Sequence, residues 1–451
     1  MRTILTADTL TPILAYLRIQ GKHKVILESI PREKENARFS IVAYNPVFDI
    51  SFDEGKLTQN GKEIAADPLD YLNHLTVKNS ESDLPFAGGA IGFVGYDMIG
   101  LYEAIGDIPK DTIGMPDLRF FVYESYVIFD YKTEKVHVVE DNCYSQRDQK
   151  AMRQTLDKVT KELQTQVDKE CAPLRPSSLD FKPHMEKAAF EKMVEKAKRY
   201  IREGDMFQCV LSQRFSSPFS GEPLDYYRQL RVANPSNYLY FFDFGDYQII
   251  GASPESLVSV KKDVVTTNPI AGTRPRGQND AQDAALAKDL QTDVKETAEH
   301  RMLVDLGRND IGKISQNGTV KVTTYMAVEY FRYVMHLTSV VKGKLLPGVQ
   351  SIEALKATLP AGTVSGAPKI RAMKRIYELE QEKRGVYAGA IGYLSASGDM
   401  DFAIAIRTMI LKNQRAYVQA GAGIVYDSVA EKEFAETLNK AKAMTRIGES
   451  R

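Results

Sequence analysis

The sequence predicts an α+β fold in which large antiparallel β-sheets pack face to face and are covered by helices. Three observations lead to this prediction. Short apolar runs at strand spacing follow one another through much of the chain. Several of these runs form pairs joined by short turns, as antiparallel neighbours do. Three strong helical patterns stand in the C-terminal part, but helices and strands do not alternate regularly, which argues against a doubly wound parallel sheet.

The N-terminal part of the chain contains a series of predicted strands. The apolar runs at 24–30 and 38–44 flank a charged turn and predict a hairpin. Residues 86–97, FAGGAIGFVGYD, are rich in glycine but lack the pattern of a nucleotide-binding loop, so we predict close backbone packing there. A second hairpin is predicted from residues 120–130 and 135–140.

The best boundary in the chain lies after these strands. Residues 146–170 are rich in Gln, Lys, Glu and Asp and predict an exposed helix, and CAPLRPSS at 171–178 adds two prolines. We therefore predict an N-terminal part, residues 1–165, and a second part, residues 180–451. The two parts are expected to share sheets and to pack as one unit.

The second part mixes helices with antiparallel strands. A helix is predicted from Lys187, because apolar residues recur at helical spacing, and Gly204 is well placed to end it. The run 206–215 predicts a strand and residues 237–253 predict a hairpin. Further helices are predicted at about 293–307, from near 368 to before 385, and at about 429–447.

The stretch from Tyr387 to Asp427 contains three apolar runs that are rich in Gly and Ala. Residues 401–410 are predicted to form one strand, with Arg407 alone on a face of small residues. Gly421, Ala422 and Gly423 in the next run would let another group approach the backbone closely. These features suit an anionic small molecule lying against a sheet, and they suit equally a tightly packed sheet with Arg407 in a structural ion pair.

Composition and charge argue against several classes of protein. The 451 residues carry a formal net charge of zero, with 43% hydrophobic and 26% charged residues. This is typical of soluble globular proteins and not of basic nucleic-acid-binding proteins. No apolar run is long enough to span a membrane, and the N-terminus lacks a continuous signal-peptide core. Three distant cysteines without a CxxC motif favour a reducing, cytoplasmic setting.

Two pairs of glutamates have a spacing that places both carboxylates on one face of a helix. Glu296 and Glu299 stand on one predicted helix, and Glu433 and Glu436 on the last one. Four carboxylates from two helices could hold a hard cation such as Mg²⁺ and leave places for water and a ligand carboxylate. A solvated acidic face explains a single pair equally simply, so the spacing alone does not decide.

Three single residues are candidates for chemistry, each with an ordinary alternative. Glu255 follows a proline at a strand junction, where shielding from water would raise its pKa and allow general-acid catalysis. His336 lies in an apolar run and is either a core histidine or a group for proton transfer. Thr363, with the following SGAPK, is expected at a helix start, as part of an anion site or as a plain N-cap.

Nine motifs stand in an order that resembles the chorismate-utilising enzymes, and among them component I of anthranilate synthase. They cover about residues 185–445, and ILES at 26–29 extends the resemblance into the N-terminal part. The motifs are GDMFQCVLSQRF, GASPES, PIAGTRPRG, DVKETAEHRMLVDLGRNDIG, YVMHLTS, GTVSGAPKIRAM, YAGAIGY, FAIAIRT and VQAGAGIVYDS.

The resemblance implies a role for each matched residue. Glu255 would protonate the departing C4 hydroxyl of chorismate, and His336 would serve the proton transfer that accompanies loss of pyruvate, with Thr363 beside them. Ammonia would add at C2, and elimination of pyruvate would then make the ring aromatic. The positions that match the family's chorismate-binding residues are Gly272, Thr273, Thr363, Tyr387, Arg407, Gly421, Ala422 and Gly423, and those that match its magnesium-binding acids are Glu296, Glu299, Glu433 and Glu436.

Two positions bear on which member of the family the chain resembles. Aminodeoxychorismate synthases typically carry a nucleophilic Lys where this chain has Ala271, and isochorismate and salicylate synthases carry a Lys base where it has Gln208. Without either lysine, an external amine is the expected nucleophile, which favours anthranilate synthase. Component I of aminodeoxychorismate synthase and a non-catalytic tryptophan-sensing homologue are the alternatives.

The resemblance also implies a partner and a regulator. A separate glutamine amidotransferase subunit would supply ammonia, because no amidotransferase signature is visible, and two large and two small subunits are expected. ILES implies feedback inhibition by tryptophan, with the N-terminal part regulatory. The matched tryptophan-binding residues are Leu27, Glu28 and Ser29 together with Asn237, Tyr238 and Leu239, of which Asn237 replaces a proline of the family.

Overall fold

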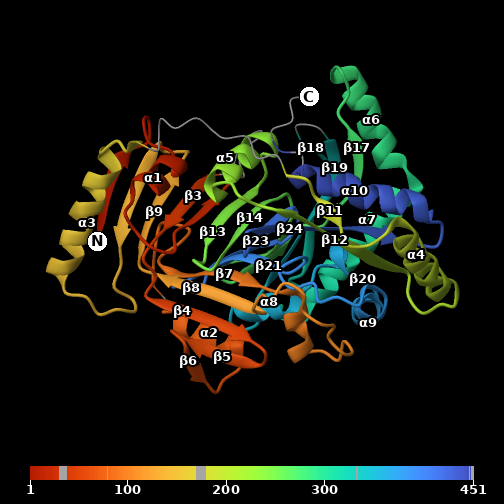
Figure 1. Cartoon of the computed structure of the whole chain (residues 1–451), viewed down its shortest axis with the longest axis horizontal. Coiled ribbons are helices and arrows are strands. Elements are labelled where there is room, and N and C mark those ends of the chain that lie inside the picture. The colour runs from red at the N-terminus through yellow and green to blue at the C-terminus, as the bar shows by residue number, and fades with distance from the viewer. Residues whose placement is uncertain (30–37, 79, 169–178, 332–333, 446, 448–451) are drawn as a thin grey trace.

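The computed structural model describes residues 1–29, 38–78, 80–168, 179–331, 334–445 and 447. Within these residues the chain forms two antiparallel sheets of twelve strands each, with helices packed around them (Figure 1). The predicted fold class is therefore confirmed. Both sheets contain strands from either side of residues 165–180, and the division of the chain into two parts stays a prediction. The proposed boundary at 171–178 lies outside the described residues.

The first sheet joins N-terminal strands at one edge to C-terminal strands at the other, with β2 and β13 adjacent at its middle. In spatial order its strands are β1 Arg2–Thr6, β10 Lys135–Glu140, β9 Ser125–Asp130, β3 Phe39–Ala43, β2 Val25–Glu28, β13 Tyr238–Asp243, β14 Tyr247–Ser253, β23 Thr408–Lys412, β24 Arg415–Ile424, β12 Gln208–Pro218 and β11 Lys182–Pro183, with β20 Gly366–Ala367 also on β12.

The second sheet has its N-terminal and C-terminal strands in contact at β7 and β21. In spatial order its strands are β17 Ile270–Pro275, β19 Val334–Lys344, β16 Val264–Thr267, β15 Ser256–Lys261, β22 Met400–Ile404, β21 Ala390–Ser395, β7 Gly89–Val94, β8 Leu118–Tyr123, β4 Phe48–Asp53, β5 Lys56–Gln59 and β6 Lys62–Ile64, with β18 Lys321–Tyr330 also on β19.

Helices cover the outer faces of the sheets, and Figure 1 shows α4, α7 and α10 gathered on the side opposite α1 and α3. None of the described helices is long and apolar enough to cross a membrane. The helices are α1 Pro12–Arg18, α2 Pro68–Thr76, α3 Gln149–Gln164, α4 Lys187–Arg202, α5 Pro223–Ala233, α6 Asp280–Thr292, α7 Val294–Gly312, α8 Ile352–Thr358, α9 Lys369–Glu380 and α10 Ala430–Thr445.

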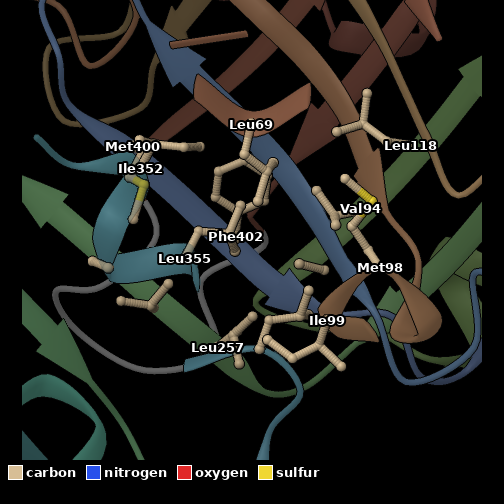
Figure 2. Packing of buried hydrophobic residues seen from close by; sticks show 14 of the residues in the cluster. Leu69, Val94, Met98, Ile99, Leu118, Leu257, Ile352, Leu355, Met400 and Phe402 are labelled. Atoms are coloured by element: carbon tan, nitrogen blue, oxygen red, sulfur yellow. The ribbon is translucent and has the colours of Figure 1, made fainter. Parts of the chain in front are cut away.

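The hydrophobic core has three main layers. Between the sheets, aromatic and branched side chains from both pack against each other, among them Phe93 of β7 and Phe242 of β13. A second layer joins the first sheet to α1, α3 and α5. A third joins the second sheet to α2, α8 and other helices, and Figure 2 shows Leu69, Leu355 and Phe402 within it. Burial of these apolar surfaces provides the main driving force for the fold.

Two predicted strands are wrong in the same way. Residues 401–410 are not one strand: β22 belongs to the second sheet, β23 to the first, and the chain crosses between them at Ala405–Arg407. Residues 120–130 likewise divide into β8 and β9, which lie in different sheets on either side of Glu124, so only β9 and β10 form the expected hairpin. Sheet membership depends on distant pairing partners, which the local alternation of side chains does not encode.

Other helical predictions need smaller corrections. The helix predicted at 293–307 extends to Gly312, and α6, which precedes it, was not predicted at all. Helix α3 is not simply exposed, because Met152, Leu156, Val159 and Leu163 are buried along one face. Thr363 does not lie at a helix start. It lies in the 3₁₀ turn Gly362–Val364, and α9 begins only at Lys369.

Candidate active site and second cavity

Two neighbouring crossings between the sheets bring Glu255 and Arg407 together. One crossing joins β14 to β15 at Pro254–Glu255, and the other joins β22 to β23. The crossings are hydrogen-bonded to each other: the amide of Ile404 donates to the carbonyl of Glu255 at 3.0 Å, and the amide of Ala252 donates to that of Arg407 at 3.1 Å. Arg407 has a positive φ of 49°, a strained conformation of the kind often found at functional sites.

A cavity of about 540 Å³ lies beside these crossings. It receives side chains or backbone from both sheets, the 3₁₀ turn, α7 and α10. Of the residues predicted from the sequence for catalysis, substrate and metal, Ala422 does not line the cavity, because its side chain is on the other face of β24 and is fully buried. The predicted residues that line it are Glu255, Gly272, Thr273, Glu296, Glu299, His336, Thr363, Tyr387, Arg407, Gly421, Gly423, Glu433 and Glu436.

Glu255 is buried at the wall of this cavity and forms no ion pair with any described residue. Burial raises the pKa of its carboxyl to about 7, although the Thr363 hydroxyl and the charges of Lys440 and Arg407 act in the opposite direction. A carboxyl with a pKa near neutrality is half protonated at physiological pH, which is the property required of a general acid.

Arg407 forms no side-chain hydrogen bond or ion pair within the part of the chain that the structure describes. Burial lowers the pKa of its guanidinium, and the Glu255 carboxylate raises it. The structural ion pair that the sequence left open is therefore not formed among these residues. A half-buried guanidinium without a partner among the described residues favours an anionic ligand, because a ligand carboxylate would supply the missing charge.

His336 on β19 is oriented by the backbone of β17. Its Nδ1 donates to the carbonyl of Gly272 at 2.8 Å, and the Thr273 hydroxyl lies 3.1 Å from the same nitrogen. The carbonyl fixes the proton on Nδ1, so Nε2 of the neutral ring carries a free lone pair. Burial lowers the pKa of His336, as does the charge of Arg407, which favours this neutral form.

Glycines form the part of the wall nearest to Tyr387. A Cβ on Gly421 would lie 2.8 Å from the Tyr387 hydroxyl and 2.9 Å from the Leu211 carbonyl. A Cβ on Gly423 would lie 2.8 Å from Nε2 of Gln208. A side chain at Gly421 would collide with backbone, and one at Gly423 would displace the end of Gln208, which explains the small face that the sequence pattern indicated.

The four predicted metal ligands reach the cavity from α7 and α10. Burial and the charge of Glu299 raise the pKa of Glu296, and burial and the charge of Glu436 raise that of Glu433. Among the described residues no group of three or more acidic, His or Cys side chains is close enough to hold a metal by itself. An all-oxygen donor set whose members repel one another nevertheless suits a hard cation that keeps several waters.

The cavity also contains polar residues that were not assigned a role from the sequence, among them Lys440 and Gln208. Lys440 donates to the carbonyl of Gly421 at 3.0 Å and pairs with Glu436 at 2.7 Å. Gln208 donates to Glu299 at 3.2 Å, and its Oε1 is buried without a described partner. Lys440 follows Glu436 by one helical turn, and this spacing was the signal in the sequence for their ion pair.

A second cavity, of about 680 Å³, lies between the sheets and is lined by all six predicted tryptophan-binding residues. The carboxylate of Glu28 is engaged elsewhere, since it accepts hydrogen bonds from Tyr227 at 2.6 Å and from Arg231 at 2.9 Å on α5. Within the cavity, the Tyr238 hydroxyl donates to Asp401 at 3.0 Å. Burial raises the pKa of Asp401 to about 6.

Comparison with known proteins decides the family. A model of the chorismate binding enzyme family matches residues 23–446. The chain belongs to this family. It is 54% identical to anthranilate synthase component 1 of Lactococcus lactis, over 99% of each chain, and 41% identical to that of Thermus thermophilus, over 99% of this chain and 97% of the relative.

Solved structures support the same assignment. The crystal structure of anthranilate synthase component I from Streptococcus pneumoniae is 66% identical, with a TM-score of 0.88 over 98% of this chain and 99% of that one. The menaquinone-specific isochorismate synthase of Escherichia coli shares the fold, with a TM-score of 0.73, 19% identity and coverage of 99% and 94%. The predicted resemblance, the fold and the prediction that the chain is an enzyme of the anthranilate synthase type are confirmed.

Proposed function

We propose that the chain is the large component of an anthranilate synthase, which converts chorismate and ammonia to anthranilate, pyruvate and water. The observation that carries the proposal is one cavity in which an arginine without a partner among the described residues, a protonatable glutamate and four further carboxylates face the same space. Chorismate carries two carboxylates and a hydroxyl leaving group. The cavity offers a cation for one carboxylate, an acid for the hydroxyl, and an acidic region that would need a metal to bind the other carboxylate.

Each group has a distinct task in this reaction. Arg407 would bind the enolpyruvyl carboxylate, and Tyr387 would lie beside it over Gly421. Glu255 would donate its proton to the C4 hydroxyl, which departs as water while the amine adds at C2. His336, neutral with a free Nε2, would accept a proton as pyruvate leaves and the ring becomes aromatic.

The nucleophile is inferred from two positions without an amine. Ala271 on β17 lines the cavity and has no group that could attack the ring. Gln208 lines it as well, and an amide cannot deprotonate water. At these two positions the chain thus supplies neither a covalent nucleophile nor a base for hydroxide, which favours an amine that enters from outside.

Mg²⁺ is proposed as the cofactor. Glu296, Glu299, Glu433 and Glu436 would hold it, since carboxylate oxygens are its preferred ligands in proteins. When bound, the ion would neutralise the acidic end of the cavity and polarise the ring carboxylate. The raised pKa values of Glu296 and Glu433 are consistent with carboxylates that repel each other until a cation is bound.

The regulatory and partner assignments are also proposals. Tryptophan would bind in the cavity between the sheets and inhibit the enzyme. A glutamine amidotransferase subunit in the cytoplasm would supply ammonia, in an assembly of two large and two small subunits. The name component 1, carried by the relatives, supports a second component in their complexes.

One assay tests the central proposal. The purified chain is incubated with chorismate, Mg²⁺ and an ammonium salt, and the fluorescence of anthranilate is followed. We expect anthranilate without any added lyase, and roughly 10³-fold slower formation by a Glu436→Gln variant purified in the same way. Aminodeoxychorismate as the only product, identified by mass spectrometry, would instead assign the chain to the folate branch. No turnover, with tryptophan still bound, would favour a sensing homologue.

A further inference from the structure

Arg384 is a fully buried arginine that lies between α9 and β21, directly behind the candidate active site. It is 1% exposed and forms a bidentate ion pair with Glu380, in which Nε lies 2.9 Å from Oε2 and Nη2 lies 2.5 Å from Oε1. Its side chain is not among those that line the cavity. It therefore has no direct route to a substrate.

The remaining donors of Arg384 bind the backbone of two segments that do line the cavity. Nη1 donates to the carbonyl of Val364, next to Thr363, and Nη2 donates to the carbonyl of Val210 on β12, each at 2.7 Å. Glu380 strengthens the second attachment, because it accepts hydrogen bonds from the amide of Ser212 at 2.7 Å and from its hydroxyl at 3.0 Å.

The same guanidinium packs against Tyr387. Its central carbon lies 5.6 Å from the centre of the Tyr387 ring and 4.6 Å from that of Tyr96, distances at which a cation is attracted by an aromatic ring. The Tyr387 ring is buried, but its hydroxyl lines the cavity above Gly421 and forms no hydrogen bond with any described residue. The hydroxyl is thus free to donate to a ligand.

We propose that Arg384 is a positioning residue for the active site, which holds Tyr387 and the turn of Thr363 at the places where they meet chorismate. Four of its five N–H groups are engaged with Glu380, Val364 and Val210. Lysine has the same charge but only three donors on one atom, so it cannot maintain this arrangement. The inference rests on the proposed function.

A merely structural arginine would affect stability in the same way, so the test must separate the two roles. Arg119 provides the control. It is partly buried, pairs with Asp49 at 3.0 Å and with Asp246 at 2.7 Å, and packs on aromatic rings, but it does not line the active-site cavity. Both Arg384→Lys and Arg119→Lys keep the charge and lose the planar donors.

The experiment is a double-mutant cycle with Arg384→Lys and Tyr387→Phe, assayed for anthranilate formation with ammonium. We expect Arg384→Lys to lower kcat/KM for chorismate by roughly 10²-fold, the cost of a misplacement of about 1 Å. We expect Arg119→Lys to lower it less than twofold at a similar thermal stability. The effect of Tyr387→Phe should be much smaller in the Arg384→Lys background, because the hydroxyl is already misplaced there.

Equal kcat/KM losses in the two lysine variants, or fully additive effects of Arg384→Lys and Tyr387→Phe, would overturn the inference. Tryptophan binding to the second cavity reports that each variant is folded. If Arg384→Lys does not fold, Ser212→Ala removes one hydrogen bond to Glu380 and should lower kcat/KM in the same direction with tryptophan binding unchanged. A wild-type chain that makes no anthranilate would overturn the proposed function and with it the inference, whereas an active wild type with equal losses in the two lysine variants would overturn the inference alone.

Discussion

The two large cavities differ in how their charged residues are paired. In the candidate active site, Arg407 and Glu255 form no ion pair with any described residue. The glutamates of α7 and α10 repel each other within each pair, although Glu436 pairs with Lys440 and Glu296 with Arg274. Among the residues that line the cavity between the sheets, Glu28 has its carboxylate bound by Arg231 and Tyr227 on α5. Asp401 accepts a hydrogen bond from Tyr238.

This difference indicates what each cavity does. Burying a charge without a partner costs free energy, so it persists where a ligand or metal supplies the partner. In the proposed active site, the transition state and not the free protein would satisfy such charges. In the second cavity Glu28 and Asp401 already have hydrogen-bond partners, whereas Lys261, Glu329 and Lys342 form no ion pair among the described residues. We expect a ligand there to be recognised by shape, backbone groups and aromatic contacts, and by these three side chains. The following predictions test whether this contrast holds.

The largest effect is expected from Glu255→Gln. The variant keeps the shape of the side chain but cannot donate a proton to the leaving hydroxyl, so kcat should fall by roughly 10⁴-fold, the upper range for a general acid. In the wild type, kcat/KM should decline as pH rises through about 7, where Glu255 loses its proton. The residual activity of the variant should not show this decline with pH. If Glu255→Gln still shows it, the decline is caused by another group.

Glu436→Gln should have the next largest effect. Removing one carboxylate from the acidic end of the cavity should weaken Mg²⁺ binding and lower turnover by roughly 10³-fold, or about 4 kcal/mol, with partial recovery at high Mg²⁺. Glu431→Gln is the matched control, because Glu431 stands on the same helix but is exposed and paired with Lys187. The initial rate measured over a range of Mg²⁺ concentrations gives the Mg²⁺ dependence of both variants. Equal Mg²⁺ dependence in the two variants would remove Glu436 from the proposed site.

Replacing a glutamate by glutamine should change the free energy of unfolding in opposite directions in the two cavities. The pKa of Glu255 is raised from 4.5 to about 7 in the folded state, so its contribution to stability is present at low pH and is lost as pH rises from about 4.5 through 7. Glu255→Gln should therefore be more stable than wild type at pH 8, by up to about 3 kcal/mol, and equal to it near pH 4.

The counterpart in the second cavity is Glu28→Gln. It leaves Arg231, which is 29% exposed, without its ionic partner, and should destabilise the protein by about 2 kcal/mol at pH 8. Thermal unfolding of both variants with wild type at pH 8 measures the contrast. The same sign of change in both would show that the pairing of charges does not distinguish the cavities.

Much of the fold and of the candidate site was predictable from the sequence, because it depends on local patterns of residues. Apolar spacing located α4 and the hairpin of β13 and β14. The motifs located thirteen residues that line one cavity and six that line the other. The roles of these residues stay predictions, which the variants above test.

Long-range pairing was not predictable from local pattern. Residues 401–410 alternate like one strand, but the chain changes sheet at Arg407, and Glu255 lies at the adjacent crossing. The geometry that sets these residues side by side therefore depends on how two distant segments pair. Arg384 was missed for a related reason, since its contacts to Val210 and Val364 join segments far apart in the sequence.

The smallest effect is expected at Ser29, which lines the cavity between the sheets. Ser29→Phe places a large ring where tryptophan is proposed to bind and should weaken inhibition by roughly tenfold, about 1.4 kcal/mol. Turnover without tryptophan should stay close to wild type, because Ser29 does not line the active-site cavity. Ser29→Ala, which adds no bulk, is the control and should shift the inhibition curve much less. Inhibition curves measured with ammonium as the amine donor test this directly. An unchanged curve in Ser29→Phe would mean that tryptophan does not bind at Ser29, and a parallel loss of turnover would mean that the two cavities are not separate in function.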